Sequence, residues 1–216
     1  MPKTKSNIPH LLGYTCTLCH KHYPYEEEML TCPACGETGI LDIDYDYDVI
    51  RRHFSRETLK SDHDNSMWRY KALFPLEDRE YSSFLRVGWT PLYRSLRLGD
   101  ELGLKAMYLK DDGVNPTASL KDRASGVAVT KALELGYDTI SCSSTGNAAS
   151  SCAGNAARVG LNTVIFVPER APQGKLAQML IFGAKVVSVI GDYRETFNLS
   201  KAAIAKYGWY NRNAGI

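Results

Sequence analysis

One lysine at the expected start of a helix is the residue of this sequence best suited to chemistry. Lys121 lies in residues 115–123, Asn-Pro-Thr-Ala-Ser-Leu-Lys-Asp-Arg, which follow an expected strand at residues 106–110 and open an expected helix. The positive end of a helix dipole disfavours a cation and therefore favours the uncharged amine. An uncharged amine can form a Schiff base with a carbonyl cofactor. The alternative is a surface lysine whose charge is compensated by Asp122.

A second candidate site follows the expected strand at residues 139–142. Residues 143–147, Ser-Ser-Thr-Gly-Asn, lie between that strand and a helix, and ligands of open α/β sheets bind at the carboxyl ends of strands. Backbone N–H groups at a helix N-terminus suit an anion, Ser144 and Thr145 add hydroxyl donors, and Gly146 lets a ligand approach. The loop predicts a small-anion site; the alternative is a helix cap without a ligand.

Four of the six cysteines form two Cys-x-x-Cys pairs, which are Cys16 with Cys19 and Cys32 with Cys35. Four thiolates can complete a tetrahedral shell around zinc, and each pair presents two sulfur atoms from one turn. The spacing predicts a structural Zn2+ site in a small ribbon, with Gly36 in a tight turn. The alternative is two unrelated pairs of reduced thiols. Such a ribbon has almost no core, so metal binding would supply most of its folding free energy.

The segments around these cysteines are expected to be short and polar. His20 and His22 are expected to be solvated, because four cysteines suffice for the metal. Residues 23–31 are expected to form a hairpin, and residues 42–48 a strand with an acidic face. Residues 51–64 are expected to be a connector with one helical turn.

Downstream of residue 96, apolar strands alternate with helices, which is typical of an α/β fold whose parallel strands are covered by helices on both faces. Four expected helices end in a glycine directly before a strand, as helices with a left-handed C-terminal residue do. These glycines are Gly136, Gly160, Gly183 and Gly208. We therefore expect the strand before Lys121 and the strand before Ser144 to be neighbours in one sheet. The apolar face of the helix at residues 121–135 is expected to comprise Ala124, Val127, Ala128, Ala132 and Leu135.

The composition is that of an ordinary globular protein. The chain has 216 residues, of which 44% are hydrophobic and 23% charged, and these fractions are typical of soluble domains. A net charge of +2 gives no reason to expect nucleic acid or an anionic membrane as a partner. Residues 1–13 show no signal peptide or membrane span, so we expect no disulfide framework and a reducing, cytoplasmic location.

The lysine segment resembles the cofactor-lysine motif of the fold-type II pyridoxal-phosphate enzymes, in the form found in threonine synthases and threonine dehydratases. The family usually has Gly, Phe and Gly where this chain has Ala118, Leu120 and Ala124. Trp-Arg-Tyr at residues 68–70 and Gly-x-Thr-Pro-Leu at residues 88–92 also resemble threonine synthases. Some threonine synthase-like proteins carry an N-terminal zinc ribbon.

The resemblance implies roles for the two loops. Lys121 would hold pyridoxal 5'-phosphate and serve as the catalytic amine, and Asn147 would donate a hydrogen bond to the phenolic oxygen of the cofactor. The substrate would be bound by Ser144, Thr145, Gly146 and, at a later strand end, Asn211 and Asn213. Many threonine synthases have Thr where this chain has Ala148, which puts one hydroxyl contact in doubt. Arg123 is expected to form an ion pair rather than to act on the substrate.

The implied fold is the tryptophan synthase β-like arrangement of open parallel sheets. The expected division is a zinc ribbon at 1–48, a connector and the start of the large domain at 49–95, a large-domain part at 96–147, a small α/β domain at 148–205, and a return toward the large domain at 206–216. The family's phosphate-binding loop and ring-nitrogen partner are not found before residue 216, so we expect a portion of a longer enzyme, inactive alone. Its partner would be a complementing C-terminal piece or a second copy.

The implied reaction is the conversion of O-phosphohomoserine and water to threonine and phosphate. Three alternatives within the same fold are a dehydratase, a sulfhydrylase and a cysteate synthase. An alternative of another class is a non-catalytic binding module led by the ribbon.

Overall fold

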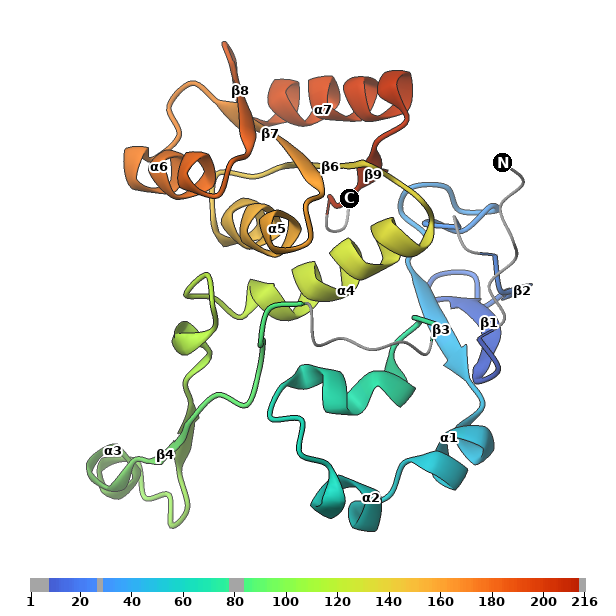
Figure 1. Ribbon diagram of the computed structural model, residues 1–216, viewed down its shortest axis with the longest axis vertical. Coiled ribbons are helices and arrows are strands. Elements are labelled where there is room, and N and C mark those ends of the chain that lie inside the picture. The colour runs from blue at the N-terminus through green and yellow to red at the C-terminus, as the bar shows by residue number, and fades with distance from the viewer. Residues whose placement is uncertain (1–7, 27–28, 78–83, 214–216) are drawn as a thin grey trace.

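The computed structural model describes residues 8–26, 29–77 and 84–213, and these residues form three separate sheets. An antiparallel sheet of order β2-β1-β3 comes first, a two-stranded sheet β4-β5 follows, and a four-stranded sheet of order β8-β7-β6-β9 comes last. Figure 1 shows the first sheet beside one end of helix α4 and the two-stranded sheet on an arm that extends from the other end.

The N-terminal sheet contains β1 (Leu11–Cys16), β2 (His22–Pro24) and β3 (Leu41–Tyr45). The expected hairpin within residues 23–31 is wrong for the described residues, because β2 pairs with β1 across the first cysteine turn. The expected strand at 42–48 ends early, since Asp46 caps α1 (Tyr47–His53) by accepting hydrogen bonds from two backbone N–H groups. The connector has a second helix, α2 (Arg56–Ser61), rather than one turn alone.

The arm consists of β4 (Leu92–Arg94), α3 (Leu96–Glu101) and β5 (Tyr108–Lys110). The two strands are antiparallel, and every residue in both is exposed. The expectation that the strand before Lys121 belongs to the same sheet as the strand before Ser144 is therefore wrong. β5 pairs instead with β4, beside which the chain returns after α3.

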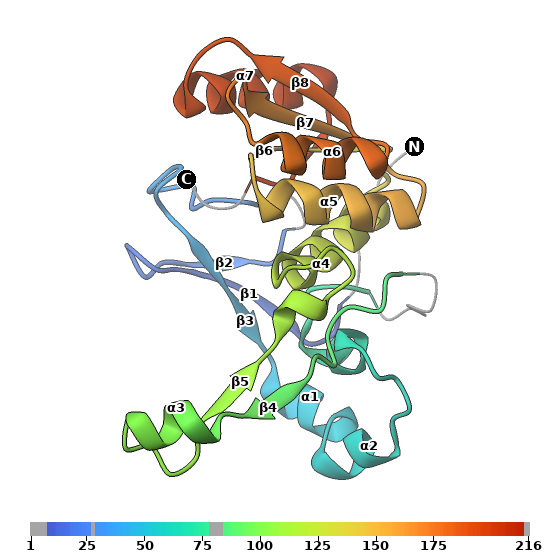
Figure 2. The ribbon, with the colours of Figure 1, turned by 90° about the vertical axis from the view of Figure 1, so that its left-hand side faces the viewer.

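The four-stranded sheet is parallel and is built from β6 (Thr139–Ser143), β7 (Asn162–Pro168), β8 (Lys185–Val189) and β9 (Tyr210–Asn211). Figure 2 shows α5 (Asn147–Arg158) and α6 (Gln173–Ile181) on one face and α7 (Tyr193–Tyr207) on the other. This layering confirms the α/β prediction. All four predicted helix-ending glycines have φ between 66° and 80°, the left-handed conformation that glycine adopts at low cost.

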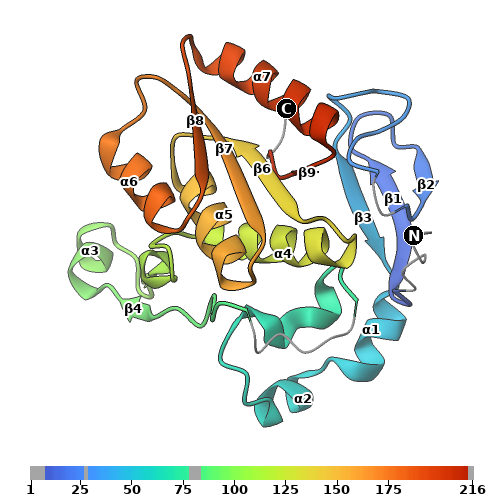
Figure 3. The same cartoon turned by 45° about the horizontal axis from the view of Figure 1, so that its top comes forward.

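Helix α4 (Lys121–Glu134) begins at the predicted lysine and lies beneath α5 (Figure 3). Its predicted apolar face is only partly correct, because Ala124 is exposed whereas Asp122, Ser125 and Val129 are buried. The reason is that α4 contacts α5 through polar pairs. Ser125 Oγ lies 2.7 Å from Ser151 Oγ, and such pairs have no signature in an apolar repeat.

A second core lies against α4. The 3₁₀ helix η1 (Met67–Leu73) contributes the first two of its residues, and a second 3₁₀ helix, η2 (Asp112–Val114), lies directly before the lysine loop. Met67, Trp68, Leu76 and Val87 form this core, so Trp68 of the Trp-Arg-Tyr segment serves packing, while Tyr70 is exposed.

Candidate cofactor site

The loop before Lys121 is held in a fixed shape by its own side chains. Asn115 donates from Nδ2 to the carbonyl of Asp112 and accepts at Oδ1 from the backbone N–H of Gly88, at 2.9 Å each. Ala118 adopts φ of 59°, a left-handed conformation that is uncommon for a residue with a Cβ atom. The preference of related motifs for glycine at this position therefore has a local conformational cause.

Asp122 anchors the loop from the first turn of α4. Its carboxylate accepts from the N–H of Thr117 and from Thr117 Oγ1, both at 2.7 Å, and from Asn155 Nδ2 of α5 at 2.9 Å. The side chain is completely buried, and this burial raises its pKa above the ordinary value, against the opposing effect of the three hydrogen bonds. Asp122 therefore joins the lysine loop to α5. The sequence indicates only that Asp122 could compensate the charge of Lys121, not this structural role.

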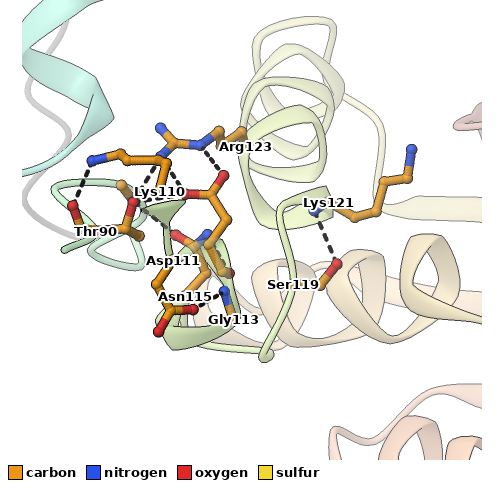
Figure 4. A network of polar contacts seen from close by, with 10 residues as sticks. Thr90, Lys110, Asp111, Gly113, Asn115, Ser119, Lys121 and Arg123 are labelled. Atoms are coloured by element: carbon orange, nitrogen blue, oxygen red, sulfur yellow. Dashed lines mark hydrogen bonds and ion pairs between the residues drawn. The ribbon is translucent and has the colours of Figure 1, made fainter. Parts of the chain in front are cut away.

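Lys121 itself is exposed at the start of α4. Its backbone N–H donates to Ser119 Oγ at 3.1 Å. Figure 4 shows its side chain extending away from the polar network around Arg123. The amine is therefore at a helix N-terminus and open to a ligand, as a Schiff-base lysine requires.

Arg123 lies in an ion-pair network on the other side of the helix start (Figure 4). Its guanidinium donates to both carboxylate oxygens of Asp112, at 2.8 and 2.9 Å, and to Thr90 Oγ1 at 3.3 Å. The hydrogen bond from Arg123 is the main cause that lowers the pKa of Asp112 to about 2. The predicted ion pair of Arg123 is confirmed, and it joins the lysine helix to the segment at residues 88–92.

The predicted anion loop leaves the carboxyl end of β6 and enters α5. Ser144 accepts at Oγ from the N–H of Gly146 at 3.2 Å, and its own N–H donates to the carbonyl of Phe166 at 3.2 Å. A Cβ atom built on Gly146 would meet no atom within 4 Å, so the space in front of this residue is open. Asn147 is the first residue of α5 and is exposed. The loop thus presents a helix N-terminus to open space, which suits an anion.

The strand end after β9 contacts the start of this loop. Asn213 Oδ1 accepts from the N–H of Ser143 at 2.7 Å, while Asn211 Oδ1 accepts from the N–H of Asn213 at 3.0 Å. Arg212 is buried and donates to Ser125 Oγ of α4 at 3.2 Å. The buried Asn213 Nδ2 has no hydrogen-bond partner within the described ranges. Asn213 therefore lies beside the 143–147 loop, and its Nδ2 donor is available there.

Two side chains of α6 connect the lysine loop with the anion loop, and sequence reasoning missed both. Lys175 Nζ donates to Asn147 Oδ1 at 2.6 Å and to Gln178 Oε1 at 3.1 Å. Gln178 Nε2 donates to the carbonyl of Thr117 at 3.3 Å. The spacing of three residues places Lys175 and Gln178 on one helix face, but nothing in the sequence indicates which loops that face meets.

The four predicted cysteines come together in the N-terminal ribbon. Their sulfur atoms all lie within 4.8 Å of one another. A Cβ atom at Gly39 would lie 2.4 Å from Cys32 Cβ and 2.8 Å from Cys35 Cβ, so this glycine, which sequence reasoning did not single out, lets the chain close around the cluster. Neither His20 nor His22 belongs to the cluster; the His22 ring instead contacts Thr15 Oγ1 at 2.8 Å. The donor set and its compactness fit a tetrahedral metal ion.

Comparison with known proteins decides the family. Residues 84–215, more than half of the chain, match the family of pyridoxal-phosphate dependent enzymes. The chain belongs to this family. The family resemblance inferred from the lysine motif is thereby confirmed, and the matched region contains Lys121 and the 143–147 loop.

Individual relatives are similar over most of this chain. The chain is 41% identical to the threonine synthase of Methanocaldococcus jannaschii, over 86% of this chain and 45% of that protein. It is 38% identical to the threonine synthase of Methanosarcina acetivorans, over 92% of this chain and 48% of that protein. The chain therefore spans slightly less than half the length of these relatives.

A solved structure of O-ureido-L-serine synthase is similar with a TM-score of 0.54 at 26% identity, over 64% of this chain and 44% of that chain. This similarity confirms the predicted fold class. Within the described ranges, no helix combines the length and the apolarity that a membrane crossing requires.

Proposed function

We propose that this chain is part of a threonine synthase, which converts O-phospho-L-homoserine and water to L-threonine and phosphate. The observation that carries the proposal is the pair of loops, 115–123 and 143–147, each opening a helix and joined through α6, in a chain 41% identical to a threonine synthase. Because the chain covers less than half of that relative, the activity belongs to the complete protein.

The exposed amine of Lys121 is the group that would hold pyridoxal 5'-phosphate. When bound, the cofactor supplies an electron-poor ring that takes up the charge left when the substrate loses its α-proton. Lys121 would take that proton at Nζ. Its exposed position in the first turn of α4 supports this role, because the amine is open to a ligand there.

The anion loop would bind and orient the substrate. Ser144, Thr145 and Gly146 would donate to its carboxylate from hydroxyl and backbone N–H groups, and Asn213 holds the loop at Ser143. Asn147 would donate from Nδ2 to the phenolic oxygen of the cofactor. The open space in front of Gly146 supports a ligand there.

The remaining parts of the proposal concern metal, organisation and partner. We propose that Cys16, Cys19, Cys32 and Cys35 hold a structural Zn2+ ion, that the chain is divided into a ribbon, a large-domain part and a small α/β domain, and that the exposed β4-β5 arm is covered by a complementing C-terminal part or a second copy. The exposure of every residue in β4 and β5 supports a covering partner. The free state of the six cysteines fits a reducing, cytoplasmic location.

Cofactor binding by the complete protein tests the proposal. Adding pyridoxal 5'-phosphate should produce an absorbance band at the edge of the visible range, and Lys121→Ala should abolish it because the Schiff-base amine is lost. Lys105→Ala, at an exposed lysine outside both loops, is the matched control and should retain the band. A wild-type protein without the band would leave only the non-catalytic module.

Substrate turnover separates the related reactions. Wild-type protein should release phosphate from O-phosphohomoserine. Turnover of threonine or serine in its place would indicate a dehydratase, and turnover of phosphoserine would indicate a sulfhydrylase or a cysteate synthase.

A further inference from the structure

The side-chain amide of Asn147 can present either its oxygen or its nitrogen to a ligand. Only the nitrogen can donate a hydrogen bond to an acceptor atom of that ligand. An asparagine side chain has an accepting oxygen and a donating nitrogen of nearly the same size. Lys175 Nζ lies 2.6 Å from Asn147 Oδ1. An ammonium group only donates, so this contact fixes which end is the oxygen and leaves Nδ2 as the outward group. Within the described part of the chain, Asn147 Nδ2 makes no hydrogen bond.

The electrostatics of α6 do not favour a lysine at position 175. Lys175 lies in the first turn, where the positive end of the helix dipole disfavours a cation. Leu176 and Met179 of α6, together with Phe182 directly after it, provide the apolar contacts with the core. Lys175 is half-buried, and its amine makes two polar contacts, to Asn147 and to Gln178, which account for its place.

The second contact of Lys175 relates the two loops to each other. Lys175 Nζ donates to Gln178 Oε1, and Gln178 Nε2 donates to the carbonyl of Thr117, four residues before Lys121. A single helical turn of α6 therefore touches both the loop that carries the amine and the residue that opens α5. These loops follow strands of two different sheets, so no shared strand pairing sets their spacing.

We propose that Lys175 is a positioning residue that holds the Asn147 amide with Nδ2 facing the ligand, and that Gln178 sets Lys175 relative to the lysine loop. This inference rests on the proposed function for the identity of the ligand, the phenolic oxygen of pyridoxal 5'-phosphate. Without Lys175, the amide would be free to turn its oxygen toward that acceptor, and the hydrogen bond would be lost in part of the molecules. A hydrogen bond of this kind is worth roughly one order of magnitude in affinity.

The contact itself is tested without cofactor. The side-chain amide protons of Asn147, assigned in a ¹⁵N spectrum by their loss in Asn147→Asp, should shift in Lys175→Met, which keeps the length of the side chain but removes its donor. Lys175→Arg should retain the wild-type signal because a donor remains. Lys185→Met, at an exposed lysine of β8, is the matched control. An Asn147 signal that is the same in wild type and Lys175→Met would overturn the proposal.

The consequence for the cofactor is tested in the complete protein. Lys175→Met should weaken pyridoxal 5'-phosphate binding about tenfold and shift the absorbance band, and Lys175→Arg should restore both. Equal affinity and an unchanged band in Lys175→Met would refute the positioning role. Loss of the band in wild type as well would refute the proposed function instead, and the spectrum of the cofactor-free protein would still decide whether Lys175 holds Asn147.

Discussion

Ala118 is held in a conformation that suits glycine better than alanine. Its φ of 59° brings the Cβ atom too close to the following carbonyl oxygen. Ala118→Gly should therefore raise the free energy of unfolding by about 0.5–1 kcal/mol, since removal of the strain outweighs the greater freedom of glycine in the unfolded chain. Urea unfolding measures the difference.

The control for this substitution is Ala128→Gly, in the interior of α4. It should lower the free energy of unfolding by about 1 kcal/mol, because a helical alanine has no strain to relieve. If Ala118→Gly destabilised the protein as much as the control does, the left-handed conformation of Ala118 would be contradicted.

The Asp112–Arg123 pair predicts a definite dependence of stability on pH. The pKa of Asp112 is lowered from 3.8 to about 2, chiefly by the hydrogen bond from Arg123. A lowered carboxyl pKa contributes stability above pH 3.8 that is lost as the pH falls toward 2. Both side chains are partly exposed, at 22% and 37%, so solvent screening reduces the contribution to roughly 1–2 kcal/mol.

Arg123→Met should remove most of this dependence. Its free energy of unfolding, followed by denaturant titration between pH 5 and pH 2, should fall less steeply than that of wild type. Arg97→Met breaks the exposed pair with Glu101 and should leave the slope unchanged. A wild-type slope in Arg123→Met would show that another group holds the carboxylate.

Much of the site was predictable residue by residue, and the remainder depends on contacts between distant segments. Lys121 and the 143–147 loop have signals in the sequence, because a strand end followed by small polar residues and a helix is a local pattern. Asp122, Lys175 and Gly39 have roles that only a partner defines. Asp122 has Thr117 and Asn155 as partners, and Lys175 has Asn147. Gly39 lies against the cysteine cluster.

At the scale of elements, the N-terminal ribbon lacks the buried surface to fold unaided. Among its apolar side chains Leu12, Leu18, Leu30 and Ile40 are all more than half exposed, and its buried apolar residues near the cluster are Tyr14, Cys16 and Cys32. If zinc occupies the cluster, metal binding supplies most of the folding free energy of β1, β2 and β3. Chelation should therefore unfold the ribbon and leave the parallel sheet intact.

Cys32→Ser tests the metal site directly. The variant should lose its zinc, as measured by metal analysis, and should be cut by trypsin within the ribbon faster than wild type is. Cys142→Ser alters a cysteine of β6 outside the cluster and should keep the metal. Equal zinc content in Cys32→Ser and wild type would exclude the site.

The helices and strands after residue 96 follow closely from the sequence, whereas their assembly into sheets does not. The start of α4, both ends of α7 and the four glycine-ended helices follow from local periodicity and capping. The pairing of β5 with β4 instead of β6 is a contact that no local pattern in the sequence records. The polar face of α4 depends on Ser125 and Asp122 having partners in α5, which no hydrophobic repeat records.

At the scale of the whole molecule, the last turn of α4 joins the ribbon to the rest of the chain. Lys131 and Glu134 form a buried ion pair with 2.8 Å between Nζ and Oε2. Lys131 Nζ also lies 3.5 Å from Tyr25 OH of the ribbon segment, and Glu134 Oε1 accepts from the N–H of Glu77 at 3.0 Å. Removing one partner of a buried ion pair leaves an uncompensated charge. Loss of either Lys131 or Glu134 should therefore also weaken the contacts that the other makes with Tyr25 or Glu77.

The opposite end of the same helix is the residue Lys121. A helix of 14 residues extends about 20 Å and is stiff over that length, so a tilt at Glu134 moves the amine as well. Because Tyr25 of the ribbon contacts the end of α4 opposite to Lys121, we expect unfolding of the ribbon to change the position of the Lys121 amine.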